Sequence, residues 1–117
     1  MSTRWTIVAL AAALSLPALA DSKVDKKTER LWKSKCASCH GMDGKAQTEK
    51  GKKMKEADYS TAEWQKSRTD EQLKKAILEG VKAEKDGVKQ EMDAYQDLTP
   101  EQVDQLVAMT RSLGAAK

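Results

Sequence analysis

The stretch Cys36-Ala37-Ser38-Cys39-His40 decides how this chain of 117 residues is interpreted. It contains both cysteines of the sequence, and the only histidine directly follows the second cysteine. Residues three and four apart on a helical turn share one face. Two thiols and one imidazole ring can therefore act together on a single ligand.

The spacing C-x-x-C-H is the attachment signature of c-type haem. Cys36 and Cys39 can reach the vinyl groups along one porphyrin edge, and His40 then projects toward the iron. A disulfide or redox dithiol with an unrelated histidine is the competing interpretation. A zinc site would need a second Cys/His cluster, and a thioredoxin-like enzyme would need a βαβ pattern. Neither feature is present in the sequence.

The first twenty residues differ in composition from the rest. They contain one base, Arg4, and no acid, and an apolar stretch precedes Pro17 and the small-residue site at 18–20. This layout predicts a secretory signal peptide at 1–20 and one domain at 21–117. The apolar stretch is too short for a comfortable membrane span. We therefore expect a periplasmic protein, anchored in the membrane only if the signal stays uncleaved.

The segment 21–117 is poor in residues that build a core. It has no Phe, and Leu, Ile and Val make up 12 of its 97 residues, below the level of about 20% at which disorder becomes the default. A buried porphyrin can replace much of the missing apolar core, so folding should depend on the cofactor. The 20 basic and 18 acidic residues leave a net charge of +2, which argues against nucleic acid as a partner.

Helix signals lie on both sides of the motif. Ser22 or Asp25 can begin a helix that runs into the motif and ends in a turn at 41–44. The lysine-rich stretch 45–57 and the polar stretch 81–91 are expected to be loops. A short helix is expected near 60–66.

Two capping boxes predict the remaining helices. Thr69-Asp70-Glu71-Gln72 begins a helix that Gly80 ends. Thr99-Pro100-Glu101-Gln102 begins a longer helix, with proline at its first position and an apolar stripe of period 3.6 that continues to Gly114.

The sixth iron ligand cannot be a second histidine of the same chain, because His40 is the only one. Methionine, lysine, an exogenous ligand or an open site remain. Met42 lies too close to His40 to reach the opposite haem face, and Met109 falls beside the apolar stripe of the last helix. Met92 follows a polar loop long enough to wrap round a haem edge, and Met54 is the weaker alternative. We predict His40 and Met92 as the axial ligands.

Three segments together resemble the class I monohaem cytochromes c of bacteria. They are Cys36-Ala37-Ser38-Cys39-His40-Gly41, Met92-Asp93-Ala94-Tyr95 and Leu106-Val107-Ala108-Met109-Thr110-Arg111. The resemblance implies the cytochrome c fold, an all-α arrangement of three to five helices around one covalently bound haem, closed by the first and last helices. It also implies an aromatic residue four before the first cysteine, here Trp32, and an axial methionine with a following aromatic, here Met92 and Tyr95.

The sequence departs from the family pattern at three places. Asp93 stands where a proline usually follows the axial methionine, which loosens this loop. Thr28 replaces the usual small residue, and Met109 replaces the usual aromatic, at the helix crossing. No proline follows the motif at the usual distance, so a carbonyl near Gly51 or Lys52 would have to orient the imidazole.

Trp64 and Tyr59 are further candidate haem contacts. The family often places a tryptophan so that its indole donates to a haem propionate, which implies this role for Trp64. Because a buried indole needs a partner, the proposal has a physical basis, but filling of the core is the alternative role.

The resemblance implies an electron carrier. The sequence shows no nucleophile–base pair and no substrate-pocket signature, so we do not expect an enzyme. Expected partners are transient redox proteins, among them a membrane oxidase or reductase, with no substrate and no nucleic acid. Lys33, Lys35 and Lys45 are candidate docking residues, or simply solvated surface. Two other functions stay open: a haem-based sensor of small ligands with an open sixth site, and a fixed electron-relay subunit of a larger oxidoreductase.

Overall fold

The computed structural model describes residues 24–115, and the predicted signal peptide at 1–20 lies outside them. The described part contains the elements α1 (Lys26–Lys35), α2 (Ala37–His40), α3 (Glu49–Lys53), α4 (Ala62–Ser67), α5 (Asp70–Glu79), β1 (Val81–Lys85), β2 (Val88–Met92) and α6 (Pro100–Ala115). None of the helices within 24–115 has the length and apolar character needed to cross a membrane.

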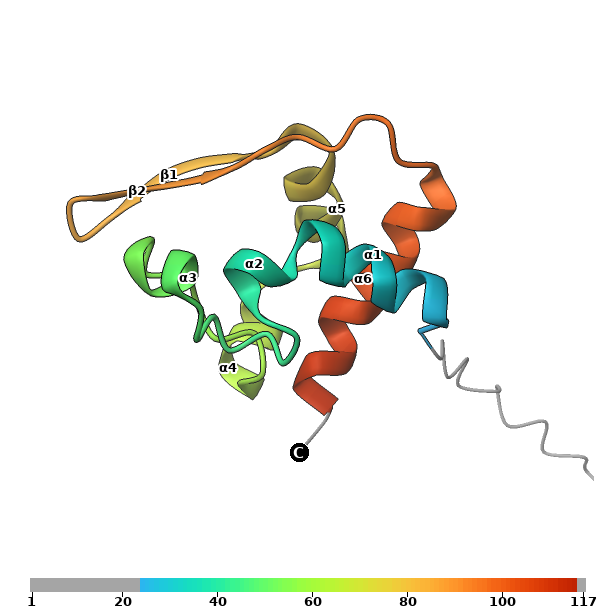
Figure 1. Cartoon of the computed structure of the whole chain (residues 1–117), viewed down its shortest axis with the longest axis horizontal. Helices are drawn as coiled ribbons and strands as arrows, with labels where there is room; N and C mark the ends of the chain where they lie inside the picture. The colour runs from blue at the N-terminus through green and yellow to red at the C-terminus, as the bar shows by residue number, and fades with distance from the viewer. Residues whose placement is uncertain (1–23, 116–117) are drawn as a thin grey trace, which may run out of the picture.

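Three helices, α1, α5 and α6, form the apolar core (Figure 1). Helix α6 packs against α1, as expected for the first and last helices, and it also packs against α5. The buried cluster consists of Trp32, Leu73, Ile77, Val103, Leu106, Val107, Met109 and Leu113. At the crossing of α1 and α6, the buried Thr28 hydroxyl donates to Gln105 Oε1 at 3.4 Å. The crossing therefore includes a polar contact where the family usually has a small residue.

Capping side chains set the starts of the long helices, as predicted. Asp25 Oδ1 accepts a hydrogen bond from the Thr28 amide at 2.8 Å at the start of α1. Both capping boxes are formed: the Thr69 and Thr99 hydroxyls accept from the amides three residues later, and the glutamine side chains at those positions accept from the threonine amides. Gly80, with φ of +77°, ends α5.

The expectation of an all-α fold needs correction, because the predicted loop 81–91 is largely a β-hairpin. Strands β1 and β2 pair antiparallel, and Lys85 lies opposite Val88. The two residues between them, Asp86 and Gly87, have φ of +50° and +78°, as a type I′ turn requires. Asp-Gly between strands is a strong hairpin signal in the sequence, and the loop interpretation overlooked it.

The number of helices also differs from the three to five that were expected, since the described part contains six. Two differences account for this: the helix predicted to run into the motif is divided into α1 and α2 at Cys36, and α3 lies in the lysine-rich stretch that was predicted as a loop. The Thr48 hydroxyl caps it by accepting from the Gly51 amide at 2.9 Å. The same hydroxyl donates to the Cys39 carbonyl at 3.0 Å, which joins α3 to α2.

Gly51 allows α3 to approach α2 closely. A Cβ atom at this position would collide with the carbonyl oxygens of Cys39 and Ala46. Both obstacles are backbone atoms, so neither can move aside without displacing the motif.

We expect Gly51→Ala to destabilise the protein by about 1–3 kcal/mol, the usual cost of overpacking. The higher helix propensity of alanine, worth about 1 kcal/mol, offsets part of this cost. Urea-induced unfolding measures the change, with Lys52→Ala on the exposed side of the same helix as the control. Equal stability of the two variants would show that α3 does not pack closely on α2.

Candidate functional site

His40 lies at the centre of the site, at the end of α2, and only 8% of its surface is exposed. Its amide donates to the Cys36 carbonyl at 2.9 Å, and its carbonyl accepts from the Ala46 amide at 3.0 Å. Burial lowers the pKa of His40 from 6.5 to about 4. The imidazole is therefore neutral at ordinary pH, which is the form that binds metals.

Two predicted aromatic residues, Tyr59 and Trp32, lie beside the His40 ring, and a third, Trp64, stacks on Tyr59. The Tyr59 ring stacks on it with centroids 4.7 Å apart, and the Trp64 ring stacks on Tyr59 at 3.9 Å. The Trp32 ring lies tilted at 6.1 Å, and its indole donates to the Gly41 carbonyl at 2.9 Å. The indole of Trp32 thus has its partner within the motif region, which links α1 to the end of α2.

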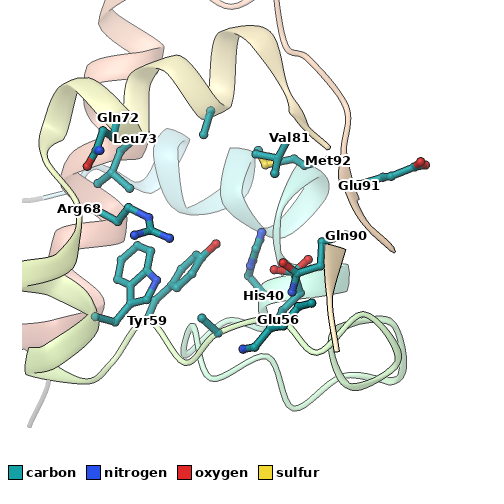
Figure 2. Close-up of a pocket in the computed structure, with 14 residues that line it drawn as sticks. His40, Glu56, Tyr59, Arg68, Gln72, Leu73, Val81, Gln90, Glu91 and Met92 are labelled. Atoms are coloured by element: carbon teal, nitrogen blue, oxygen red, sulfur yellow. The ribbon is translucent and has the colours of Figure 1, made fainter. Parts of the chain in front are cut away.

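A cavity of about 520 Å³ opens beside His40 (Figure 2). Sites for small molecules and cofactors usually have about 300–1,000 Å³. Its wall comes from α2, the segment 56–59, α4, α5 and the hairpin. Two smaller cavities, of about 60 and 190 Å³, also adjoin His40. Together they leave room for a cofactor next to the imidazole.

Met92 is the methionine that lies with His40 around all of this space. Both residues line the three cavities, and Figure 2 shows the His40 ring pointing toward the side of the cavity where Met92 lies. Met54 lines only the cavity of about 190 Å³ among these three. Met42 is 51% exposed, and Met109 is buried in the core. Of the four methionines in the described part, Met92 thus adjoins the most of the space beside His40.

The two cysteines adjoin the same space. Cys36 lines both smaller cavities, Cys39 lines the cavity of about 190 Å³, and both thiols are free. Burial raises the pKa of Cys36 to about 11. A redox-active dithiol needs a cysteine with a lowered pKa. The geometry therefore fits thiols that face a cofactor better than a dithiol reaction centre.

Tyr95 lies on the cysteine side of the site. Its hydroxyl donates to the Lys35 carbonyl at 3.1 Å, and the Lys35 ammonium lies 5.4 Å from the centre of its ring. Lys35 also lines the two smaller cavities, together with Lys50 at the larger of them. Lys33 and Lys45, the other two predicted docking lysines, are exposed but line none of these three cavities beside His40.

One sequence-based expectation about His40 is not met. Its Nδ1 atom is buried and has no hydrogen-bond partner in the described part of the chain. The carbonyls that were expected to hold the ring bond elsewhere: Gly51 O accepts from the Glu56 amide at 2.9 Å, and Lys52 O accepts from the Lys55 amide at 3.2 Å.

Sequence reasoning missed the polar part of the lining of the large cavity. Arg68, Gln72, Glu56 and Gln90 contribute to it, and Figure 2 shows Arg68 and Gln72 on the side of Tyr59 and Glu56 and Gln90 on the side of His40. Burial raises the pKa of the Glu56 carboxyl. No local motif marks these residues, because they reach the cavity from four separate segments.

Arg111 fixes the segment that carries Tyr59, Trp64 and Arg68. Its guanidinium donates to the Gln65 carbonyl at 2.7 Å, to the Arg68 carbonyl at 2.6 Å and to Asp70 Oδ1 at 2.8 Å. The Gln65 amide group in turn donates to the carbonyls of Tyr59 and Thr110, at 2.7 and 2.9 Å. Helix α6 therefore positions one whole wall of the cavity.

The site defines a class of protein. A C-x-x-C-H helix presents two thiols and a neutral imidazole to a cavity, and a methionine lies on the same cavity. This set of donors fits c-type haem, whose iron takes a histidine and whose porphyrin takes two cysteines. The chain has the architecture of a c-type cytochrome.

Comparisons with known proteins agree with this class. Residues 24–108 match the family described as cytochrome c oxidase, cbb3-type, subunit III, and the chain belongs to this family of c-type cytochromes. A solved structure described as the KustC0563 c-type cytochrome is 30% identical, with a TM-score of 0.60 over 74% of this chain and 95% of the other. No curated protein matches significantly. The protein thus binds haem c covalently and is a haem-based electron carrier.

We expect Arg111→Ala to lower the free energy of unfolding by about 1.5–3 kcal/mol, because two backbone carbonyls, the Gln65 side-chain oxygen and Asp70 lose a charged donor. The partly exposed ion pair with Asp70 contributes little of this. Asp70→Asn should therefore cost much less than Arg111→Ala in denaturant unfolding. Equal losses for the two variants would place the stabilisation in the ion pair and not in the contacts with the carbonyls.

Proposed function

We propose that the protein is a periplasmic electron carrier in which Cys36 and Cys39 hold the haem through thioethers, while His40 and Met92 bind its iron from opposite faces. One observation supports this most directly. His40 and Met92 line the same three cavities, and the cysteines adjoin two of them. When bound, the haem supplies a one-electron couple at its iron.

The chain's own residues prepare the site for that couple. Burial keeps the His40 ring neutral, so no proton has to leave before it binds metal. The thioether of Met92 is a soft ligand, and Met/His ligation raises the reduction potential. We expect Arg68 and the Trp64 indole to hold the haem propionates, because both can donate hydrogen bonds and both line the large cavity.

A carrier needs no substrate site at the metal. With Met92 as sixth ligand, the iron has no free position for a substrate or a gas. This supports electron transfer over catalysis or sensing as the role of the protein. We therefore propose that it is not an enzyme.

Electron exchange would take place where the cysteine edge of the site reaches the surface. Lys35 and Lys50 line the opening there, together with the carboxylates Glu56, Glu91 and Asp93. The charge on this rim is mixed, so long-range attraction should be modest. We propose that transient redox proteins dock here.

A fixed electron-relay subunit is the second candidate function. It is favoured by the family match, whose description is that of an oxidase subunit. The two functions differ in how long the partner stays bound, because a relay subunit remains in its complex and a carrier dissociates.

We expect Met92→Leu to abolish the weak iron–sulfur charge-transfer band of the oxidised protein. Met92→His should give bis-histidine ligation and a clearly lower potential, since axial ligands tune haem potentials over about 0.8 V. Absorption spectra and redox titration measure both effects. Met109→Leu, in the core, is the matched control and should keep the band. Retention of the band in Met92→Leu would move the ligand to Met54.

We expect electron transfer with an acidic partner to slow as salt rises from 0.01 to 0.1 M, over which the Debye length falls from about 30 to about 10 Å. Lys35→Glu should slow association several-fold. Lys27→Glu, on the same helix but away from the cavity opening, should not.

Stopped-flow kinetics at several salt concentrations measure these rates. Rates indifferent to salt and to the Lys35 reversal would show that the partner docks through apolar contacts. Copurification of the protein with an oxidase at high salt would favour the fixed relay over the transient carrier.

A further inference from the structure

Two parts of the cavity lining, one around His40 and one formed by the β1–β2 hairpin, are joined by few contacts. One wall carries His40 and continues into α3. The other is the β1–β2 hairpin, which follows α5 and ends at Met92. In Figure 1 the hairpin extends from the end of α5 past α3. The relative position of the two proposed axial ligands depends on what holds these walls together.

Gln90 makes the shortest contacts between the walls. Its side-chain amide donates to the carbonyls of Met54 and Lys55, at 2.9 and 3.0 Å. The Lys85 ammonium lies 3.4 Å from the Lys55 carbonyl, and the ion pair of Lys55 with Asp86 measures 3.9 Å. Both of these contacts are longer and involve exposed groups, so they contribute little. Of the two Gln90 hydrogen bonds, the one to Lys55 is also exposed, whereas the one to Met54 is partly buried.

Gln90 is also coupled to Met92 through the strand. Residues two apart on a strand face the same side. Gln90 and Met92 are both half-buried, while Lys89 and Glu91 are exposed. Figure 2 shows the Glu91 side chain extending from the strand on the side opposite to Gln90, although Glu91 also adjoins the cavity.

The acceptor side of the contact is a constrained turn. Lys55 has φ of +52°, in the left-handed region that non-glycine residues rarely adopt. Its amide donates to the Lys52 carbonyl at 3.2 Å, and the next amide, of Glu56, donates to the Gly51 carbonyl at 2.9 Å. Because Gly51 packs on α2, this turn is anchored to the motif that carries His40.

We infer that Gln90 is the positioning residue for Met92: by bonding to the Met54–Lys55 turn, it holds the hairpin across the cavity and Met92 opposite His40. Gln90 acts through the strand and is not itself a ligand. The inference rests on the proposed axial ligation by Met92.

The test measures, in the haem-bearing protein, the rate at which added imidazole replaces Met92 as the iron ligand. Gln90→Leu removes both donated hydrogen bonds, and the exchange should become about 5- to 30-fold faster. Gln90→Arg keeps donors that can reach the carbonyls and should restore a rate near that of the unmodified protein. Lys89→Leu, on the exposed face of the same strand, is the matched control and should leave the rate unchanged.

Two results would overturn the inference about Gln90. One is an exchange rate in Gln90→Leu equal to that in Lys89→Leu. The other is failure of Gln90→Arg to slow the exchange, because packing and not hydrogen bonding would then be the cause. A different result would overturn the proposed ligation itself: an unmodified oxidised protein that lacks the iron–sulfur band.

A second measurement does not depend on the iron ligand. Amide hydrogen exchange reports opening of the hairpin directly. Exchange within 88–92 should be faster in Gln90→Leu than in Lys89→Leu. Equal exchange in the two variants would contradict a role for Gln90 in holding the hairpin.

Discussion

A shortage of apolar side chains is the constraint that shapes this structure. The buried cluster is confined to α1, α5 and α6, and its most buried member, Leu106, is 2% exposed. The segment that contains α2 and α3 contributes chiefly His40, Ala46 and Gly51 to the interior. Because this segment has little hydrophobic surface of its own to bury, a large apolar cofactor next to His40 is needed to complete the core.

Polar contacts with backbone carbonyls hold the cavity walls where apolar packing is missing. Arg111 fixes the segment 59–70 from α6, and Gln90 joins the hairpin to the end of α3. Each donor satisfies more than one carbonyl, and carbonyls in loops need such partners when they are partly buried. The same contacts therefore serve stability and the placement of the proposed ligands.

The sequence predicted the parts of the molecule that local signals determine. The C-x-x-C-H motif and the capping residues Asp25, Thr69 and Thr99 have roles within three or four residues, and the structure agrees with the predicted helix starts. The hairpin also had a local signal, the Asp86-Gly87 turn, which the expectation of a loop did not use. The hairpin could therefore have been predicted from the sequence.

Other features could not be predicted from local sequence signals, because the residues that interact are distant in the chain. Arg111 bonds to residues 41 to 46 positions away, and Gln90 to residues 35 and 36 positions away. No spacing rule connects such positions, so the wall containing Arg68 and the contact of Gln90 appear only in the folded chain. The expectation for His40 Nδ1 fails for a different reason: family spacing suggested the carbonyl of Gly51 or Lys52, but in the described part of the chain both carbonyls accept hydrogen bonds within the turn at 51–56.

The dependence of the fold on the cofactor is the central claim, and one measurement tests it most directly. The same chain is produced with and without the machinery that attaches haem, and far-ultraviolet circular dichroism is recorded during heating. The haem-bearing form should be helical and unfold cooperatively, while the haem-free form should have little helix and no cooperative transition. A haem-free chain with full helix content and a cooperative transition would contradict the claim that the cofactor completes the core.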